Sequence, residues 1–339
     1  MHIGIAGAGL MGRLLAWKLS TLGHAIDLFD QDLSGQQSAA YAAAGMLSPC
    51  TEAIVSQASI FELGRQSLAL WPRIIKDLGA TIPLNTNGSI IVCHSNDTAE
   101  LHHFIQRLSL KHDATQIQSL DHDQLTQLEP ELCMNHGFHL INEGTIDNRC
   151  LLSALNSALS QRAVTQIEAH VTSTQPYCIQ TTTQAYHYDW AFDCRGMGNK
   201  QHFKTLRAVR GEVIRVHAPD VNLTHMIRLL HPRYPVYIVP QANQQYVIGA
   251  TEIESDDTSP ISVRSCLELL NAAYSIHSGF AEARIIETCS ALRPTLPDNL
   301  PRIIHEAGFS AINGLYRHGF LIAPALLEQC LLTIPEKIT

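Results

Sequence analysis

Three glycines between an apolar strand and a helix constrain this chain more than any other feature. Residues 2–7 (HIGIAG) are typical of a buried strand, residues 10–23 repeat apolar side chains at helical spacing, and residues 25–30 (AIDLFD) form a second apolar run. Gly7, Gly9 and Gly12 lie at the first turn with the spacing G-x-G-x-x-G. This order predicts a strand, a tight turn, a helix and a parallel strand, which is the beginning of an α/β sheet.

The glycine turn also predicts a site for phosphate groups. The first glycine permits the turn, the second lets a pyrophosphate approach the backbone, and the third lets the helix pack closely on the strand. The helix N-terminus offers free N–H groups and the positive end of the helix dipole. Asp30 ends the second strand, where its carboxylate can accept hydrogen bonds from ribose hydroxyls. The pattern therefore predicts a bound dinucleotide, NAD or FAD, and disfavours NADP, because the acid would repel a 2′-phosphate.

The rest of the chain alternates between helical and strand patterns. Helices are predicted over residues 59–78, 148–159, 262–275 and 320–334, and a polar helical stretch over residues 96–128. A strand pair is predicted in residues 136–147, and strands are predicted within residues 163–175, 185–196, 208–218, 235–241 and 244–253. Asn87-Gly88 lies between two apolar runs and predicts a hairpin. The simplest arrangement is two interleaved domains, one of α/β type and one built on a mixed or antiparallel sheet.

Composition disfavours several classes of partner. The chain has 339 residues, with 23 Lys and Arg against 31 Asp and Glu, which argues against nucleic acid or an anionic membrane as the main partner. The nine cysteines form no C-x-x-C pair, so we expect reduced thiols, a cytoplasmic location and no metal centre. No segment approaches the roughly 20 apolar residues that span a bilayer. The glycine motif begins in the first strand, so no signal peptide is expected.

The stretch 38–49, SAAYAAAGMLSP, bears on the choice between NAD and FAD. Its small side chains and many backbone donors would let it lie flat against a broad planar ligand. Taken alone, the stretch favours an alanine-rich helix.

Seven ordered stretches resemble the D-amino-acid oxidase superfamily of flavoproteins, and within it the glycine oxidases of thiamine biosynthesis. They are the glycine motif, SAAYAAAGMLSP, GTIDNRCLLSAL, VRGEVI, YIVPQ with YVIGATE, LRPTLPDNLP and GLYRHGFLIAPA. Together they extend from residue 3 to residue 327. The resemblance implies a Rossmann-like FAD-binding domain of discontinuous segments, residues 1–78, 145–205 and 286–339. It also implies a substrate domain, residues 79–144 and 206–285, with a mixed, largely antiparallel sheet.

The resemblance also implies cofactor contacts. Gly7, Gly9 and Gly12 would hold the pyrophosphate and Asp30 the ribose. The region between phosphate and flavin ring would be lined by Ser38, Ala43, Ala44, Gly45 and Met46. Val171 would contact the adenine side, and the pyrimidine edge would be covered by Arg317, His318, Gly319, Phe320 and Leu321. We expect FAD to be non-covalent, because no cysteine lies in GLYRHGF.

For the reaction, the resemblance implies that Arg293 binds the substrate carboxylate, that the Tyr237 hydroxyl joins this contact, and that Met46 forms an apolar wall. A guanidinium suits this task because it offers two parallel donors to a carboxylate. The expected activity is FAD-dependent oxidation of glycine or another small amino acid to the imine and 2-oxo acid. Ammonia and hydrogen peroxide are the other products, with oxygen as acceptor.

Several alternatives stay open. They are a D-amino-acid dehydrogenase with another acceptor, an oxidase of N-methyl amino acids or of modified-tRNA amines, and a flavin-binding protein without turnover. A homo-oligomer is also left open. The chain departs from the family pattern at Cys289, Gln241 and the segment around Arg317. These departures bear on the choice of amino acid more than on FAD binding.

Overall fold

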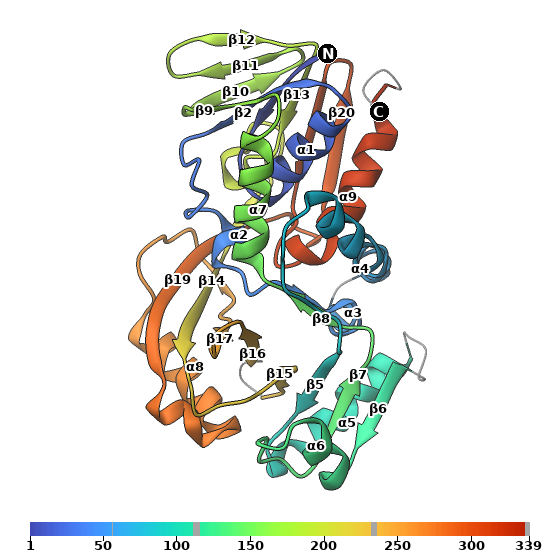
Figure 1. Cartoon of the computed structure of the whole chain (residues 1–339), viewed down its shortest axis with the longest axis vertical. Helices are drawn as coiled ribbons and strands as arrows, with labels where there is room; N and C mark the ends of the chain where they lie inside the picture. Colours follow the sequence, from blue (N-terminus) through green and yellow to red (C-terminus); the bar gives the residue numbers. More distant parts are fainter. Residues whose placement is uncertain (56, 111–115, 232–235, 336–339) are drawn as a thin grey trace.

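The computed structural model describes residues 1–55, 57–110, 116–231 and 236–335. Figure 1 shows an elongated molecule with both chain termini at one end, beside a parallel sheet, and a larger, strongly curved sheet at the other end. The two sheets and the segments between them position the candidate site.

The first sheet contains the N-terminal strand and has the strand order β20-β21-β13-β1-β2-β9. Its strands are β1 (His2–Ala6), β2 (Ala25–Asp30), β9 (Val164–Glu168), β13 (Trp190–Asp193), β20 (Arg302–Glu306) and β21 (Phe309–Asn313). All neighbours pair in parallel except β20 and β21. Ile3, Ile5 and Leu28 lie on one face and Ala6 and Phe29 on the other, and all are buried. Burial on both faces explains why the inner strands β1 and β13 are largely apolar.

Helices cover one face of this sheet. They are α1 (Leu10–Thr21), α4 (Ala58–Leu78), α7 (Asn148–Ser160) and α9 (Gly319–Thr333). The Trp71 side chain of α4 donates a hydrogen bond to the Phe320 carbonyl at 3.0 Å, which joins α4 to α9. Helix α9 is buried on nearly all sides, so its sequence is apolar all round. The other face packs against a three-stranded sheet of β10 (Val171–Gln175), β11 (Cys178–Thr181) and β12 (Ala185–His187).

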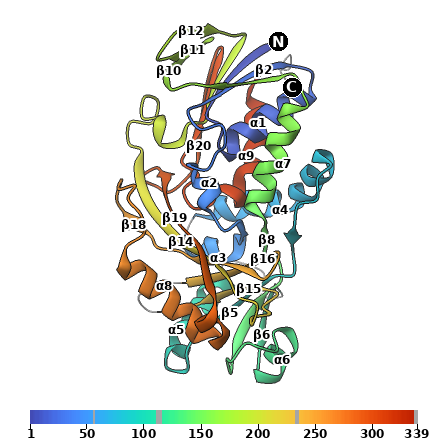
Figure 2. The same cartoon turned by 60° about the vertical axis from the view of Figure 1, so that its left-hand side comes forward.

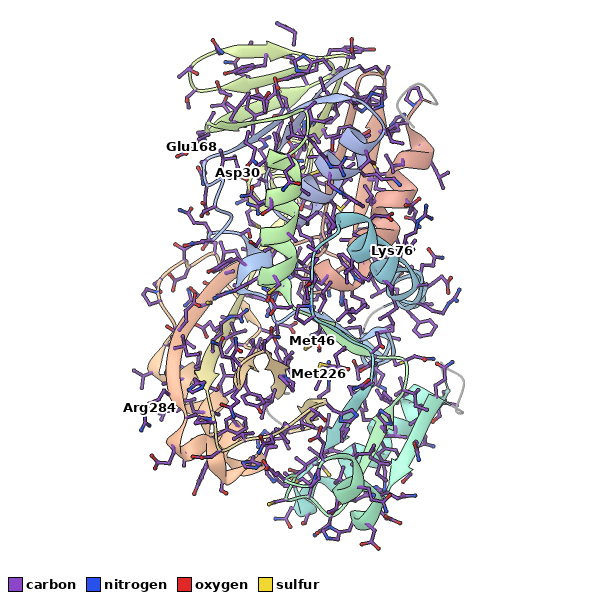
Figure 3. The ribbon with its side chains drawn as sticks, in the orientation of Figure 1. Asp30, Met46, Lys76, Glu168, Met226 and Arg284 are labelled. Atoms are coloured by element: carbon purple, nitrogen blue, oxygen red, sulfur yellow. The ribbon has the colours of Figure 1, made fainter. Side chains whose placement is uncertain are left out.

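The second large sheet is mixed and has the order β18-β14-β17-β16-β15-β5-β7-β6, with β19 also paired to β14. Its strands are β5 (Ser89–Val92), β6 (Ile117–Leu120), β7 (Gly137–Leu140), β14 (Arg207–His217), β15 (Met226–Leu229), β16 (Val236–Gln241), β17 (Gln245–Gly249), β18 (Ile253–Glu254) and β19 (Arg284–Thr295). Figure 2 shows β14 and β19 extending from this sheet toward the first one. One face packs on α8 (Val263–Ile276) and η4 (Ser278–Glu282), and the other carries Met226 (labelled in Figure 3), Tyr237 and Val247.

Short elements complete the structure. They are α2 (Ala39–Ala42), α3 (Pro49–Val55), α5 (Thr98–Ser109), α6 (His122–Leu128), η1 (Ser95–Asp97) and η3 (Gly196–Gly198). A small sheet of β3 (Met46–Leu47), β8 (Gly144–Ile146) and β4 (Leu84–Asn85) joins the two large sheets.

Three local predictions are wrong. The predicted hairpin at Asn87-Gly88 does not form, because β4 pairs with β8 while β5 pairs with β7 and β15. The two strands predicted in residues 136–147 also belong to different sheets. The polar stretch 96–128 is not one helix, since it contains α5, β6 and α6, and residues 111–115 lie outside the described residues. The predicted strand 235–241 is β16, with Pro235 outside the described residues.

The predicted fold class is confirmed, since the chain has a mixed α/β fold with a parallel sheet made from distant segments and a second, mixed sheet. Within the described residues, no helix combines the length and apolar character needed to cross a membrane.

Candidate active site

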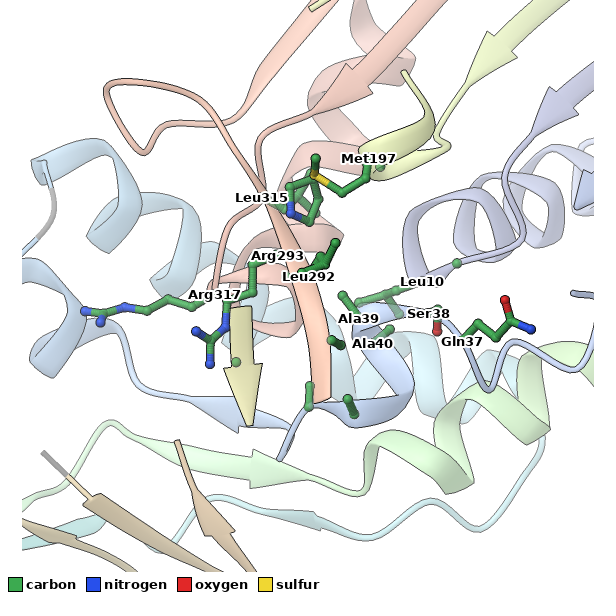
Figure 4. Close-up of a pocket in the computed structure, with 18 of the residues that line it drawn as sticks. Leu10, Gln37, Ser38, Ala39, Ala40, Met197, Leu292, Arg293, Leu315 and Arg317 are labelled. Atoms are coloured by element: carbon green, nitrogen blue, oxygen red, sulfur yellow. The ribbon is translucent and has the colours of Figure 1, made fainter. Parts of the chain in front are cut away.

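A long cavity of about 1590 Å³ runs from the glycine turn to the curved sheet. Its walls come from segments far apart in the sequence, including the turn after β1, the stretch around α2, the strands β14 and β16, and the loop before α9. Figure 4 shows Ser38 and Leu10 at one side of this region and Arg293 and Arg317 at the other. The volume exceeds that of most single-ligand pockets, which are roughly 300 to 1,000 Å³.

The three glycines of the turn have three different environments. Gly7 has a φ of +100°, a conformation that favours glycine. At Gly12 an added Cβ would overlap the Gly7 carbonyl oxygen, so this residue serves close packing of α1 on the turn. At Gly9 an added Cβ would meet no atom within 4 Å, and the residue lines the cavity. The backbone at Gly9 is therefore open to a ligand at the N-terminus of α1.

Asp30 is tied to the same turn. The Ala8 N–H donates to one carboxylate oxygen of Asp30 at 2.6 Å, and the Asp32 N–H donates to the other at 3.1 Å. Behind the turn, the buried Arg13 side chain donates to the carbonyl oxygens of Ala8 at 2.7 Å and Leu33 at 2.8 Å. These bonds fix the position of the Asp30 carboxylate at the cavity wall.

The stretch 38–46 forms a thin wall of small residues. Ser38 caps α2 by accepting a hydrogen bond from the Tyr41 N–H at 3.2 Å. Gly45 has a φ of +74°, and a Cβ there would overlap the Ile146 carbonyl oxygen, so β8 packs directly on this backbone. The Asn148 amide donates to the Ala40 carbonyl at 2.8 Å and supports the wall from behind. The alternative of one long alanine-rich helix is excluded, since α2 ends at Ala42.

Tyr237 and Arg293 line the other end of the cavity. The Arg293 guanidinium donates to the Thr251 carbonyl at 3.0 Å, and no carboxylate pairs with it among the described residues. Two glycines make room for these side chains. A Cβ at Gly211 would overlap the Arg293 guanidinium, and a Cβ at Gly249 would lie 2.7 Å from the Tyr237 hydroxyl. Burial raises the pKa of Tyr237, and the positive charge of Arg293 opposes that rise.

A buried carboxylate organises the basic residues beside this end. Glu52 in α3 lies 2.8 Å from Nε of Arg317, 3.3 Å from Nδ1 of His318 and 3.8 Å from Nη2 of Arg228. Burial opposes its ionisation, but the adjacent Arg317 charge holds the pKa of Glu52 below its ordinary value. Arg317 also pairs with Glu252 at 2.7 Å. Burial lowers the pKa of His318 to about 4, so this ring is neutral at physiological pH.

The comparisons with known proteins agree on one family. The FAD dependent oxidoreductase (DAO) family model matches residues 2–327. The chain belongs to this family. A Rhizobium etli protein assigned as the thiamine biosynthesis oxidoreductase ThiO is 36% identical to this DAO-family chain and is matched over 97% of this chain and 95% of its own length.

A glycine oxidase of Geobacillus kaustophilus is 23% identical over 95% of this chain and 89% of its own length. The crystal structure of glycine oxidase from Bacillus cereus has a TM-score of 0.84 at 22% identity, covering 98% of this chain and 96% of the other. The similarity to the Bacillus cereus structure shows that the two chains have the same fold.

The DAO-family protein is an FAD-dependent oxidoreductase, and its cavity suits this cofactor. The backbone at Gly9 is open where a pyrophosphate would lie, and the wall at 38–46 presents backbone and small side chains to a planar group. FAD supplies the hydride-accepting chemistry when bound, so the task of the chain is to bind and orient the cofactor and the substrate. Within the described residues, no group of three or more His, Cys, Asp or Glu could hold a metal ion.

Most predicted site residues lie around this cavity. The lining includes Gly7, Gly9, Asp30, Ser38, Ala43, Ala44, Gly45, Met46, Val171, Tyr237, Arg293, Arg317, Gly319 and Phe320. Three others, Gly12, His318 and Leu321, are buried behind the lining and do not form part of it. The Val171 carbonyl accepts a hydrogen bond from Arg195 at 2.8 Å, so this backbone oxygen already has a protein partner.

Sequence reasoning missed four lining or supporting residues: Arg13, Glu52, Arg195 and Arg228. For Arg228 a signal existed, because a charged residue inside the apolar strand MIRL is costly to bury without a partner. Arg13 occupied an interior position of a predicted helix and gave a weaker signal of the same kind. Glu52 and Arg195 gave none.

Proposed function

We propose that this DAO-family protein oxidises a small amino acid, glycine among the candidates, at its carbon–nitrogen bond. The substrate would lose a hydride to FAD, the imine would hydrolyse to a 2-oxo acid and ammonia, and oxygen would reoxidise the flavin with release of hydrogen peroxide. The observation that carries this proposal is the Arg293 guanidinium at the cavity wall beside Tyr237, without a carboxylate partner among the described residues.

The proposed roles follow from these positions. Arg293 binds the substrate carboxylate, the Tyr237 hydroxyl donates to it, and Met46 forms an apolar wall. Such fixation raises the rate because hydride transfer needs the reacting atoms about 3 to 3.5 Å apart. Gly7, Gly9 and Asp30 would contact the far end of FAD, and the segment around Arg317 its pyrimidine edge.

We also propose a place in thiamine biosynthesis, supported by the relative in Rhizobium etli, and a cytoplasmic location, supported by the cysteine pattern. The division into an FAD-binding domain (1–78, 145–205, 286–339) and a substrate domain (79–144, 206–285) is likewise our proposal. In the structure, the last segment of the first group begins within β19, which pairs with β14 of the second group.

Anaerobic reduction of the bound flavin tests the proposed function. Glycine, sarcosine or D-alanine should bleach the flavin absorbance, and admission of air should then yield peroxide. Bleaching without peroxide would favour a dehydrogenase with another acceptor, and no bleaching by any amino acid would contradict the proposal. Acid precipitation should release the yellow colour, because the cofactor is expected to be non-covalent.

Arg293→Ala tests the anchor itself. Loss of a charge-assisted carboxylate contact should cost about 2 to 4 kcal/mol in kcat/KM while FAD stays bound. Arg284→Ala is a matched control, because Arg284 lies on the same strand and its side chain is 75% exposed. Equal kinetics of the two variants would contradict the role of Arg293.

A further inference from the structure

Arg228 is a buried arginine that faces the cavity and has no role in the reaction proposed above. It lies on β15, pairs in register with Tyr237 on β16, and lines the same end of the cavity. Its side chain is only 11% exposed. In the described part of the chain, Nε and Nη2 are buried without a hydrogen-bond partner, and the residue lines the cavity.

The carboxylates near Arg228 neutralise part of its charge but accept no hydrogen bond from it. Oε1 of Glu52 forms an ion pair with Arg228 at 3.8 Å, too long for a hydrogen bond, while Oε2 accepts a hydrogen bond from Arg317 at 2.8 Å. Glu143 is also close enough to interact electrostatically with Arg228, yet it accepts hydrogen bonds from Thr51 and Ser89. A buried guanidinium without an acceptor is costly, since desolvation is not balanced by hydrogen bonds. The position of Arg228 is therefore explained best by an anion that enters the cavity.

This anion is distinct from the carboxylate that we assign to Arg293. The strands run β15, β16, β17, β14 and β19, so four strand steps separate the two arginines. At about 4.8 Å a step, their backbones are roughly 19 Å apart along the sheet. The Arg293 guanidinium donates to the carbonyl of Thr251, just after β17. About two strand steps, or roughly 10 Å, therefore separate this guanidinium from β15, the strand of Arg228. Tyr237, on β16 between β15 and β17, is close enough to interact electrostatically with both guanidinium groups. One carboxylate is too small to contact both.

We propose that Arg228 binds a second anionic group of the substrate. The cavity then favours an amino acid with an additional carboxylate, on its side chain or on its nitrogen, over one with an apolar substituent. This inference rests on the proposed function for the first carboxylate. It adds the chemical class of the group at the opposite end of the substrate.

The test measures binding of two unreactive acids of equal length, butyrate and succinate, by the change that they cause in the bound flavin spectrum. Succinate should bind the FAD-loaded protein about 10-fold to 100-fold more tightly than butyrate, the gain expected from one charge-assisted contact. Arg228→Met should remove this preference and leave butyrate binding unchanged, whereas Arg228→Lys should retain part of it. The flavin content of each variant reports whether it is folded.

Two outcomes would overturn the proposal. The first is equal affinity of the wild-type protein for butyrate and succinate. The second is an equal loss of affinity for both acids in Arg228→Met. The second result would make Arg228 part of the first carboxylate site.

Anaerobic reduction of the flavin by glycine, D-aspartate and iminodiacetate separates this proposal from the proposed oxidase function. Reduction by glycine without succinate preference contradicts only the role of Arg228. Succinate preference that depends on Arg228, without reduction by any amino acid, supports the second site and contradicts the oxidase function.

Discussion

The guanidinium group of Arg293 lies over Gly211, in the space that a Cβ atom at that position would occupy. The two residues belong to β19 and β14, which pair along their whole lengths. The conformation of the proposed substrate anchor is therefore set by the absence of a side chain on the neighbouring strand.

Gly211→Ala should displace Arg293 without loss of FAD. A misplacement of about 1 Å at a substrate-orienting group costs up to roughly 100-fold in rate, so we expect kcat/KM to fall by about 10-fold to 100-fold. Steady-state kinetics with flavin content as a check measures this. The double variant with Arg293→Lys should show less than the sum of the two losses, because both act on one contact. Additive losses would show that Gly211 acts independently of Arg293.

The glycine turn offers a matched pair of variants. Gly12→Ala should destabilise the protein even without cofactor, because its Cβ would overlap the Gly7 carbonyl. Gly9→Ala should fold normally, because its Cβ meets no protein atom within 4 Å, but should bind FAD at least about 10-fold more weakly. Urea unfolding of the apoprotein and titration with FAD separate the two effects. Unchanged FAD affinity in Gly9→Ala would contradict a phosphate site at this turn.

The pH dependence of stability should report on His318. Burial lowers its pKa to about 4, so in the folded state it stays neutral while the unfolded chain takes up a proton below pH 6.5. Its contribution is therefore fully present above pH 6.5 and is lost as the pH falls toward 4, by at most about 3 kcal/mol. The unfolding free energy, measured by urea denaturation, should fall more steeply between pH 7 and pH 4.5 for the wild type than for His318→Gln. His187→Gln, on the exposed strand β12, is the control, and equal slopes for all three proteins would contradict the prediction.

Glu52 and Glu252 both pair with Arg317 but differ in burial. Glu52→Gln should cost about 3 to 5 kcal/mol in unfolding free energy, because it leaves buried guanidinium groups without their carboxylate. Glu252→Gln should cost less than about 1 kcal/mol, since the Glu252 side chain is 50% exposed. Denaturation at saturating FAD measures the loss of unfolding free energy in both variants. Similar costs would show that burial of Glu52 does not decide the strength of the pair.

The part of the fold with local signals was predictable. The strand, turn and helix at the N-terminus follow from periodicity and three glycines, and the structure reproduces them as β1, α1 and β2. The pairing at Asn87-Gly88 was not predictable, because the flanking strands find partners in distant parts of the chain. The full extent of strand β19 was not predicted, since most of its side chains are half-buried or exposed and show no alternation. Glu52 gave no signal, because its burial depends on Arg317, which lies far along the sequence.

Strand β21 occupies an inner position of the parallel sheet, between β13 and β20, and α9 follows it as the last helix. Ribosomal synthesis delivers the glycine turn long before these two elements. For most of its time on the ribosome, the nascent chain thus has an incomplete sheet and an apolar cluster that is not yet covered by α9. Because Gly319 and Phe320 of α9 line the cavity, we expect FAD to bind stably only after α9 has been synthesised. A chain that terminates before α9 should be recognised by chaperones and degraded instead of accumulating as a colourless apoprotein.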